Sequence, residues 1–213
     1  MLINELDSDS VNLPTTDVFE FVELFETTGT SVSLNGYSLI YVNGNGDVTY
    51  FALDLDGFNT SATGYFTAGS IPTADVQVNG TPAPGNFLQN GADAVVLYLG
   101  DASAFPNGTA LASLVPANIV DAVVYDTSDA DDAGLLTLLV GGGQVDENGA
   151  SNGALDSIGR LPNGSGAARN TTTWTTMVPT PGAANGVVIP EPATLLLAAL
   201  GVVATLASRR RRS

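Results

Sequence analysis

The apolar runs of this chain are short, and turn residues separate them, which limits the fold more than any other feature. Residues 37–42 and 48–53 are two such runs, and they flank the turn Asn45-Gly46-Asp47. Asn-Gly and Asp-Gly pairs favour the positive φ angles of tight turns. No long segment before residue 187 shows the apolar period of a helix. The sequence therefore predicts an all-β fold, most simply a β-sandwich.

The predicted central strand covers residues 18–25, because both of its faces are apolar. We expect Glu20 and Glu23 in it to be only partly exposed, so that they need backbone N–H donors or a bound ion as partners. The other predicted strands cover residues 2–6, 37–42, 48–53, 64–68, 94–99 and 119–125, while residues 135–140 are ambiguous between strand and helix and residues 111–115 fit one helical turn.

The last 25 residues differ from the rest. An apolar run covers residues 193–207; it follows Pro190, Glu191 and Pro192 and precedes a cluster formed by Arg209, Arg210, Arg211 and Arg212. As a helix, 15 residues would cover about 23 Å at ~1.5 Å per residue, which is short for a ~30 Å hydrocarbon core but within reach of a thin bilayer. We predict one short transmembrane helix here, with the arginines on the cytoplasmic side and the preceding domain outside.

In its order of elements this tail resembles the PEP-CTERM sorting signal of bacterial surface proteins. The resemblance covers residues 189–212 and implies that a membrane-embedded exosortase binds the tail and removes it near Pro190-Glu191-Pro192. The protein would be membrane-anchored through residues 193–207 until processing, and then reside at the cell surface or in the extracellular matrix. A plain membrane anchor is the alternative. We divide the chain into a body, residues 1–186, and a sorting signal, residues 187–213, and expect an export signal upstream of Met1.

Composition excludes several kinds of chemistry. The chain has no cysteine, histidine or lysine, which removes disulfides, thiolate zinc sites, Ser-His-Asp triads and Schiff-base lysines. Residues 1–189 contain every acid except Glu191 but only Arg160 and Arg169, so their net charge is −19. Such a body repels nucleic acid, and we predict no nucleic-acid partner.

Several segments of the body, in their order along the chain, resemble a bacterial lamin-tail domain. The match runs over residues 2–185 and is carried by Ile3-Asn4-Glu5-Leu6-Asp7, Glu20-Phe21-Val22-Glu23-Leu24, Leu34-Asn35-Gly36-Tyr37-Ser38-Leu39, Leu88-Gln89-Asn90-Gly91-Ala92-Asp93-Ala94-Val95, Ser157-Ile158-Gly159-Arg160-Leu161-Pro162-Asn163-Gly164, Trp174 and Pro179-Thr180-Pro181-Gly182-Ala183-Ala184-Asn185. The resemblance implies an immunoglobulin-like β-sandwich that serves as a non-catalytic structural or adhesive module. Envelope polysaccharide is a candidate partner in that setting.

Carboxylates are the remaining candidates for a site. Calcium takes six to eight oxygen ligands, and acids near the N-terminus could supply some of them: Glu5, Asp7, Asp9, Asp17 and Glu20. Further acids crowd the loop 126–143, and for both clusters a solvated acidic loop is favoured over calcium binding. We expect no cofactor other than this candidate calcium. The alternative function is a secreted calcium-dependent carbohydrate-active enzyme or carbohydrate-binding module. Hydrolysis would use paired carboxylates, and sugar stacking would use aromatic side chains: Tyr37, Tyr41, Tyr50, Phe51 and Trp174.

Overall fold

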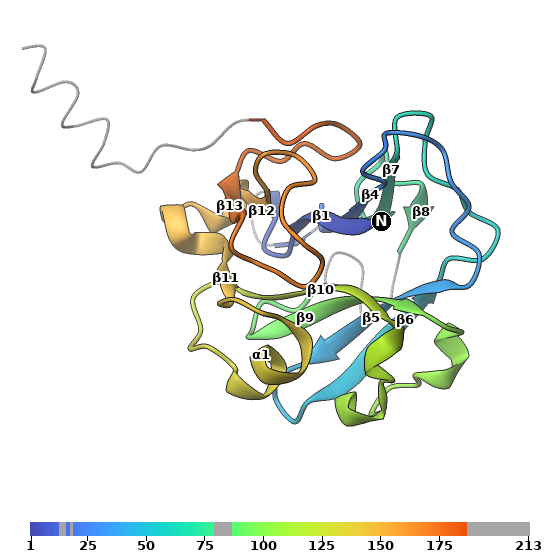
Figure 1. Ribbon diagram of the computed structural model, residues 1–213. Helices are drawn as coiled ribbons and strands as arrows, with labels where there is room; N and C mark the ends of the chain where they lie inside the picture. Colours follow the sequence, from blue (N-terminus) through green and yellow to red (C-terminus); the bar gives the residue numbers. More distant parts are fainter. Residues whose placement is uncertain (13–15, 18, 79–86, 187–213) are drawn as a thin grey trace, which may run out of the picture.

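The computed structural model describes residues 1–12, 16–17, 19–78 and 87–186. Two β-sheets face each other across one core (Figure 1). One sheet has the order β13-β12-β1-β4-β7-β8, and the other has the order β11-β10-β9-β5-β6. The strands are β1 (Leu2–Asp7), β2 (Val11–Asn12), β3 (Thr16–Asp17), β4 (Phe21–Phe25), β5 (Tyr37–Asn43), β6 (Val48–Asp54), β7 (Tyr65–Gly69), β8 (Val76–Gln77), β9 (Asp93–Leu99), β10 (Ile119–Asp126), β11 (Val145–Asp146), β12 (Ser157–Arg160) and β13 (Trp174–Met177).

The prediction of a mainly β fold with two sheets is confirmed. The strands expected from the apolar runs are present, and the one expected to be central, β4, lies between β1 and β7. The hairpin of β5 and β6 forms as its turn sequence predicts, with φ of +106° at Gly46 and +51° at Asp47. Sequence patterns did not predict the pairing of β1 with β12, which joins residues 154 positions apart in the register Glu5 to Gly159.

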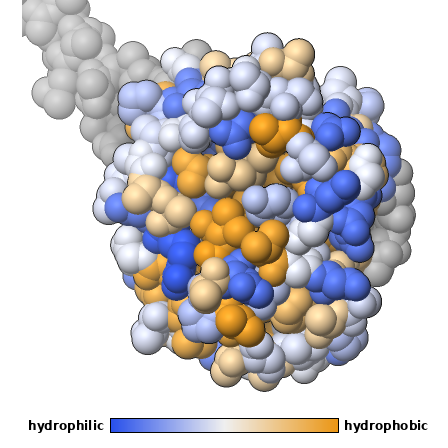
Figure 2. All heavy atoms as spheres, turned by 45° about the vertical axis from the view of Figure 1, so that its right-hand side comes forward, coloured by the Kyte–Doolittle hydropathy of each residue, from blue (hydrophilic) through white to orange (hydrophobic). Residues whose placement is uncertain are grey.

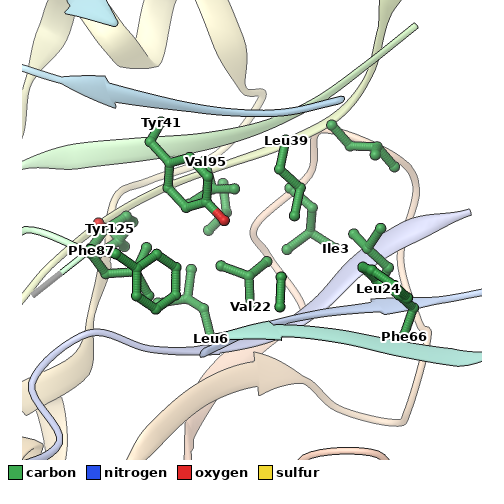
Figure 3. Packing of buried hydrophobic residues seen from close by; sticks show 14 of the residues in the cluster. Ile3, Leu6, Val22, Leu24, Leu39, Tyr41, Phe66, Phe87, Val95 and Tyr125 are labelled. Carbon is green, nitrogen blue, oxygen red and sulfur yellow. The ribbon is translucent and has the colours of Figure 1, made fainter. Parts of the chain in front are cut away.

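The core between the sheets is apolar and closely packed. Side chains of the first sheet, such as Val22 and Phe66, meet Leu39 and Val95 of the second sheet (Figure 3). Tyr41 projects into the same space and its ring contacts Phe87, with centroids 5.6 Å apart. Burial of such apolar surface supplies the main driving force for the assembly of the two sheets.

A second apolar layer covers the outer face of the second sheet. Helix α1 (Ala133–Leu139) buries Leu135 and Leu139 there, against Val42 and Val124 of the sheet. The short 3₁₀ helices are η1 (Ala102–Ala104), η2 (Leu111–Ser113), η3 (Pro116–Asn118), η4 (Glu147–Ala150) and η5 (Gly153–Leu155).

The ambiguity at residues 135–140 is therefore resolved as helix. Asp132 caps α1 by accepting hydrogen bonds from the N–H groups of Gly134 and Leu135. A capping aspartate followed by leucines four residues apart is a helix signal that the shortness of the segment obscured.

Two other expectations need correction or lie outside the structure. Glu20 and Glu23 are not partly exposed but fully buried, at 0% exposure each. The loop residue Phe87 covers Glu20, and the loop residue Gly182 covers Glu23. The predicted helix 193–207 lies outside the described residues, and no helix within the described ranges is long and apolar enough to cross a membrane.

Candidate functional site

Three buried side chains gather on the outer face of the first sheet. β1 contains a bulge, because its pairing with β4 passes from Ile3–Leu24 to Glu5–Glu23 and skips Asn4. The bulge directs two consecutive side chains, Asn4 and Glu5, away from the core. Their neighbours Ile3 and Leu6 point into the core. Glu23 lies directly opposite Glu5 on β4. Two carboxylates and an amide thus lie side by side on this face.

The segment 179–185, which we call the exit strap, runs across these side chains. The Glu5 carboxylate accepts hydrogen bonds from the Thr180 N–H at 2.8 Å and from the Thr180 hydroxyl at 2.8 Å. The Glu23 carboxylate accepts the Gly182 N–H at 2.7 Å and the Asn4 side-chain amide at 2.7 Å. Since hydrogen bonds to ionised groups are stronger than neutral ones, these contacts hold the strap firmly when the carboxylates are charged.

Asn185 closes the strap. Its side chain is 5% exposed and donates to the Asn4 and Arg160 carbonyl oxygens, both at 3.0 Å. Its backbone N–H donates to the Asn163 side-chain oxygen at 2.9 Å. The last described residue that is bound to the body is therefore Asn185, followed by exposed Gly186.

Burial changes the ionisation of the two glutamates. Removal from water, together with the nearby Glu5 charge, raises the pKa of Glu23 to about 8, although hydrogen bonds from Asn4 and Gly182 act in the opposite direction. The pKa of Glu5 is also raised by burial, against hydrogen bonds from Ser157 and Thr180. The ionisation of this pair is thus coupled to the seating of the strap.

A buried ion pair stabilises the strands next to these side chains. Arg160 and Asp121 are both fully buried, and the guanidinium Nη2 lies 3.0 Å from the carboxylate Oδ2. The Arg160 Nε also donates to the Ile3 carbonyl at 2.8 Å, and Nη1 donates to the Ser165 carbonyl at 3.0 Å. The guanidinium further lies over the Trp174 ring, 5.4 Å from its centroid. Arg160 thereby fastens β12 and the loop after it to β1.

The four candidate calcium ligands whose side chains the structure describes, Glu5, Asp7, Asp9 and Glu20, do not meet in one site. Glu5 serves the exit strap, and Glu20 accepts the N–H groups of Phe87 and Leu88 at 2.6 and 2.9 Å. Asp9 accepts from the Asn90 side chain at 3.2 Å, Asp7 ends β1, and Asp17 belongs to β3. Within the described ranges, no group of three acids is arranged to hold a metal ion. The expectation that a buried glutamate needs a backbone N–H partner is confirmed at Glu20 and Glu23.

A separate acidic pocket of about 510 Å³ opens beside the β5–β6 turn. It brings Asp129 and Asp132 of the 126–143 loop to Asp93 of β9. Burial and these two charges raise the pKa of Asp93 to about 6, against a hydrogen bond from the Gly44 N–H. The pocket concentrates negative charge and attracts cations.

The remaining predicted groups have structural contacts. Of the aromatic side chains considered for sugar stacking, Tyr41 is fully buried and Trp174 is 9% exposed beside Arg160, so both belong to the interior. The carboxylate pair Glu5 and Glu23 is covered by the exit strap, which leaves these two groups no contact with an external substrate. Figure 2 shows one face of the molecule, where apolar groups gather near the centre and polar side chains surround them.

The contacts of the exit strap and of the Arg160–Asp121 pair were not predicted from the sequence. A signal for the ion pair exists, since Asp121 interrupts an apolar strand and Arg160 is one of two arginines in a strongly acidic body. The contacts of Thr180 and Asn185 have no comparable local signal.

Comparison with known proteins identifies the tail. Residues 188–212 match the PEP-CTERM protein-sorting motif. No curated protein and no solved structure matches the chain significantly, and the family comparison gives no support for a lamin-tail domain in the body. The predicted sorting residues Pro190, Glu191 and Pro192, and the cluster Arg209, Arg210, Arg211 and Arg212, lie within the matched segment but outside the described residues. The motif implies that the protein is exported, carries a C-terminal sorting region and is recognised by an exosortase.

Proposed function

We propose that this chain is a non-catalytic module of the bacterial cell surface or extracellular matrix, with a structural or adhesive role, which an exosortase processes at its C-terminal signal. The observation that carries the proposal is the position of the sorting motif. The match begins at residue 188, and Asn185 is the last residue in the described part of the chain that is hydrogen-bonded to the folded body. This position is the one expected for a sorting signal that follows a folded exported domain.

We further propose that the body is a lamin-tail-like, immunoglobulin-like sandwich without a cofactor, and that residues 193–207 hold it at the membrane until cleavage. In support, the first and last segments that carry the lamin-tail resemblance contact each other, through Glu5 with Thr180 and Asn4 with Asn185. Envelope polysaccharide is the proposed binding partner, because the sorting motif implies that the body is exported to the cell envelope. Nucleic acid is not a proposed partner, since the body is strongly negative.

The test is mass spectrometry of the C-terminus of the protein produced in an exosortase-containing bacterium, with a matched strain that lacks the exosortase. We expect a mature chain that ends near Pro190–Pro192 in the first strain and a chain that retains Arg209–Ser213 in the second. Retention of the arginine cluster in both strains would refute processing and leave a plain anchor. Hydrolysis of a polysaccharide by the purified body would refute the non-catalytic role.

A further inference from the structure

The exit strap fixes how far the sorting motif can extend from the body. Four residues, Gly186 to Ile189, separate anchored Asn185 from Pro190. A chain extends by at most ~3.6 Å per residue, so Pro190 can lie no more than about 18 Å from Asn185. Without the strap contacts, the last fixed residue would be Met177 at the end of β13, and the same limit would be about 47 Å.

This short reach is comparable to the size of the body itself. A folded domain of this length has a radius of gyration of about 16 Å. An enzyme that holds Pro190-Glu191-Pro192 must therefore contact or closely approach the body while the strap is seated. The surface around the exit exposes Gly182, Ala183 and Ala184, and Val178 at 48%, and no strap residue carries a charged side chain that would attract an enzyme to it.

The contacts that set the reach come from the opposite end of the chain. Thr180 is bound to Glu5, 175 residues away, and Asn185 is bound to Asn4, 181 residues away. Gly182 is bound to Glu23, 159 residues away. The reach is short only when β1 and β4 are assembled with the C-terminal strands.

We propose that the exit strap is a latch that limits access of the exosortase to the sorting motif by keeping the motif within about 18 Å of the folded body. The inference rests on the proposed function, because it needs an exosortase that cuts this tail. The effective concentration of a tethered group is low when the tether barely spans the distance, and it rises as the tether lengthens towards the required span. Release of the latch or a longer linker should therefore speed processing.

The experiment compares the rate of processing in the native-type host, followed by pulse-labelling and C-terminal mass spectrometry, for four chains. These are the unaltered chain, a chain with Gly-Ser-Gly-Ser inserted after Gly186, the latch variant Thr180→Ala/Asn185→Ala, and a chain with both changes. The insertion alters no hydrogen bond among residues 1–186 that the structure describes, so it reports on reach even if the latch variant folds poorly. A control variant, Thr172→Ala/Asn45→Ala, replaces exposed residues of the same types elsewhere on the body. Hydrogen exchange at the Thr180, Gly182 and Asn185 amides verifies that the latch opens only in the latch variants.

We expect the insertion and the latch variant each to raise the processing rate severalfold, the combination to add little to either, and the control to match the unaltered chain. Equal rates for the unaltered and inserted chains would overturn the latch proposal while processing itself stands. Slower processing of the inserted chain would overturn it as well. A chain that retains residues 193–213 in every variant would overturn the proposed function and, with it, the latch.

Discussion

Replacement of Glu23 by Gln should remove a large part of the pH dependence of the stability of this protein. Glu23 is fully buried, and its pKa is about 8 in the folded body against an ordinary value of 4.5. A carboxyl group whose pKa is raised by folding stabilises the folded state most below its unfolded pKa. As the pH rises from 4.5 towards 8, the unfolded chain loses the Glu23 proton while the folded chain retains it, and the free energy of unfolding falls.

The magnitude follows from the two pKa values. At 1.36 kcal/mol for each pH unit, the interval from 4.5 to about 8 corresponds to about 5 kcal/mol. Such a figure is a large part of the ~5–15 kcal/mol that usually stabilises a folded domain. Glu5 and Asp93 have raised pKa values too, so the unaltered protein should lose stability with rising pH through several groups. The Glu23→Gln variant isolates one of them.

The assay is urea unfolding at half-unit steps between pH 4 and 9. We expect the curves of the free energy of unfolding against pH for the variant and the unaltered protein to diverge in slope between pH 5 and 8, with the variant less dependent on pH. The glutamine also places an amide group against the donors Asn4 and Gly182, which adds a destabilisation that does not vary with pH. Replacement of the exposed Asp131 by Asn controls for the loss of one charge. Parallel curves for Glu23→Gln and the unaltered protein would refute the argument that burial dominates the ionisation of Glu23.

Two further predictions concern buried side chains, and a third concerns calcium. Arg160→Met should destabilise the body by ~3–5 kcal/mol, because it leaves the Asp121 charge buried without its cation, and Arg160→Met/Asp121→Leu should recover part of that loss. Urea unfolding measures both effects, and an unchanged unfolding midpoint in the single variant would contradict this explanation. Tyr41→Phe should be neutral or stabilising by about 1 kcal/mol, since the Tyr41 hydroxyl is buried with no hydrogen-bond partner among the described residues. A decrease of more than about 1 kcal/mol in the free energy of unfolding, in the same assay, would reveal a partner for this hydroxyl. Millimolar calcium should leave the thermal midpoint of the purified body equal to that in chelator, whereas a bound site at a hundredfold excess over Kd would add ~2.7 kcal/mol and raise the midpoint by several degrees.

The sequence predicts those parts of the fold that depend on neighbours along the chain. The β5–β6 hairpin was predictable because two apolar runs flank one Asn-Gly-Asp turn, and the two apolar faces of β4 indicated a central strand. The need of Glu20 and Glu23 for backbone donors followed from the scarcity of arginine in the body.

The candidate site was not predictable in the same way, because its contacts join distant segments. Nothing near Thr180 shows that its hydroxyl and N–H will meet Glu5, and the bulge that turns Asn4 outward becomes visible only in the register with β4. Helix α1 was ambiguous for a different reason, since seven residues are too few to distinguish a buried helix from a strand by periodicity alone.

The pairing of β1 between β4 and β12 has a consequence for the order of folding during export. A chain that crosses a membrane N-terminus first delivers β1 early, but one neighbour of β1 arrives only with Gly159. Contacts between residues so far apart form slowly, because the loop must close before the contact stabilises anything. The first sheet therefore cannot be completed until most of the chain has crossed, and the strap contacts form only once Thr180 and Asn185 have followed. Completion of the first sheet and arrival of the sorting motif at the membrane would thus be nearly simultaneous, whereas strands β5, β6, β9 and β10 of the second sheet can pair earlier.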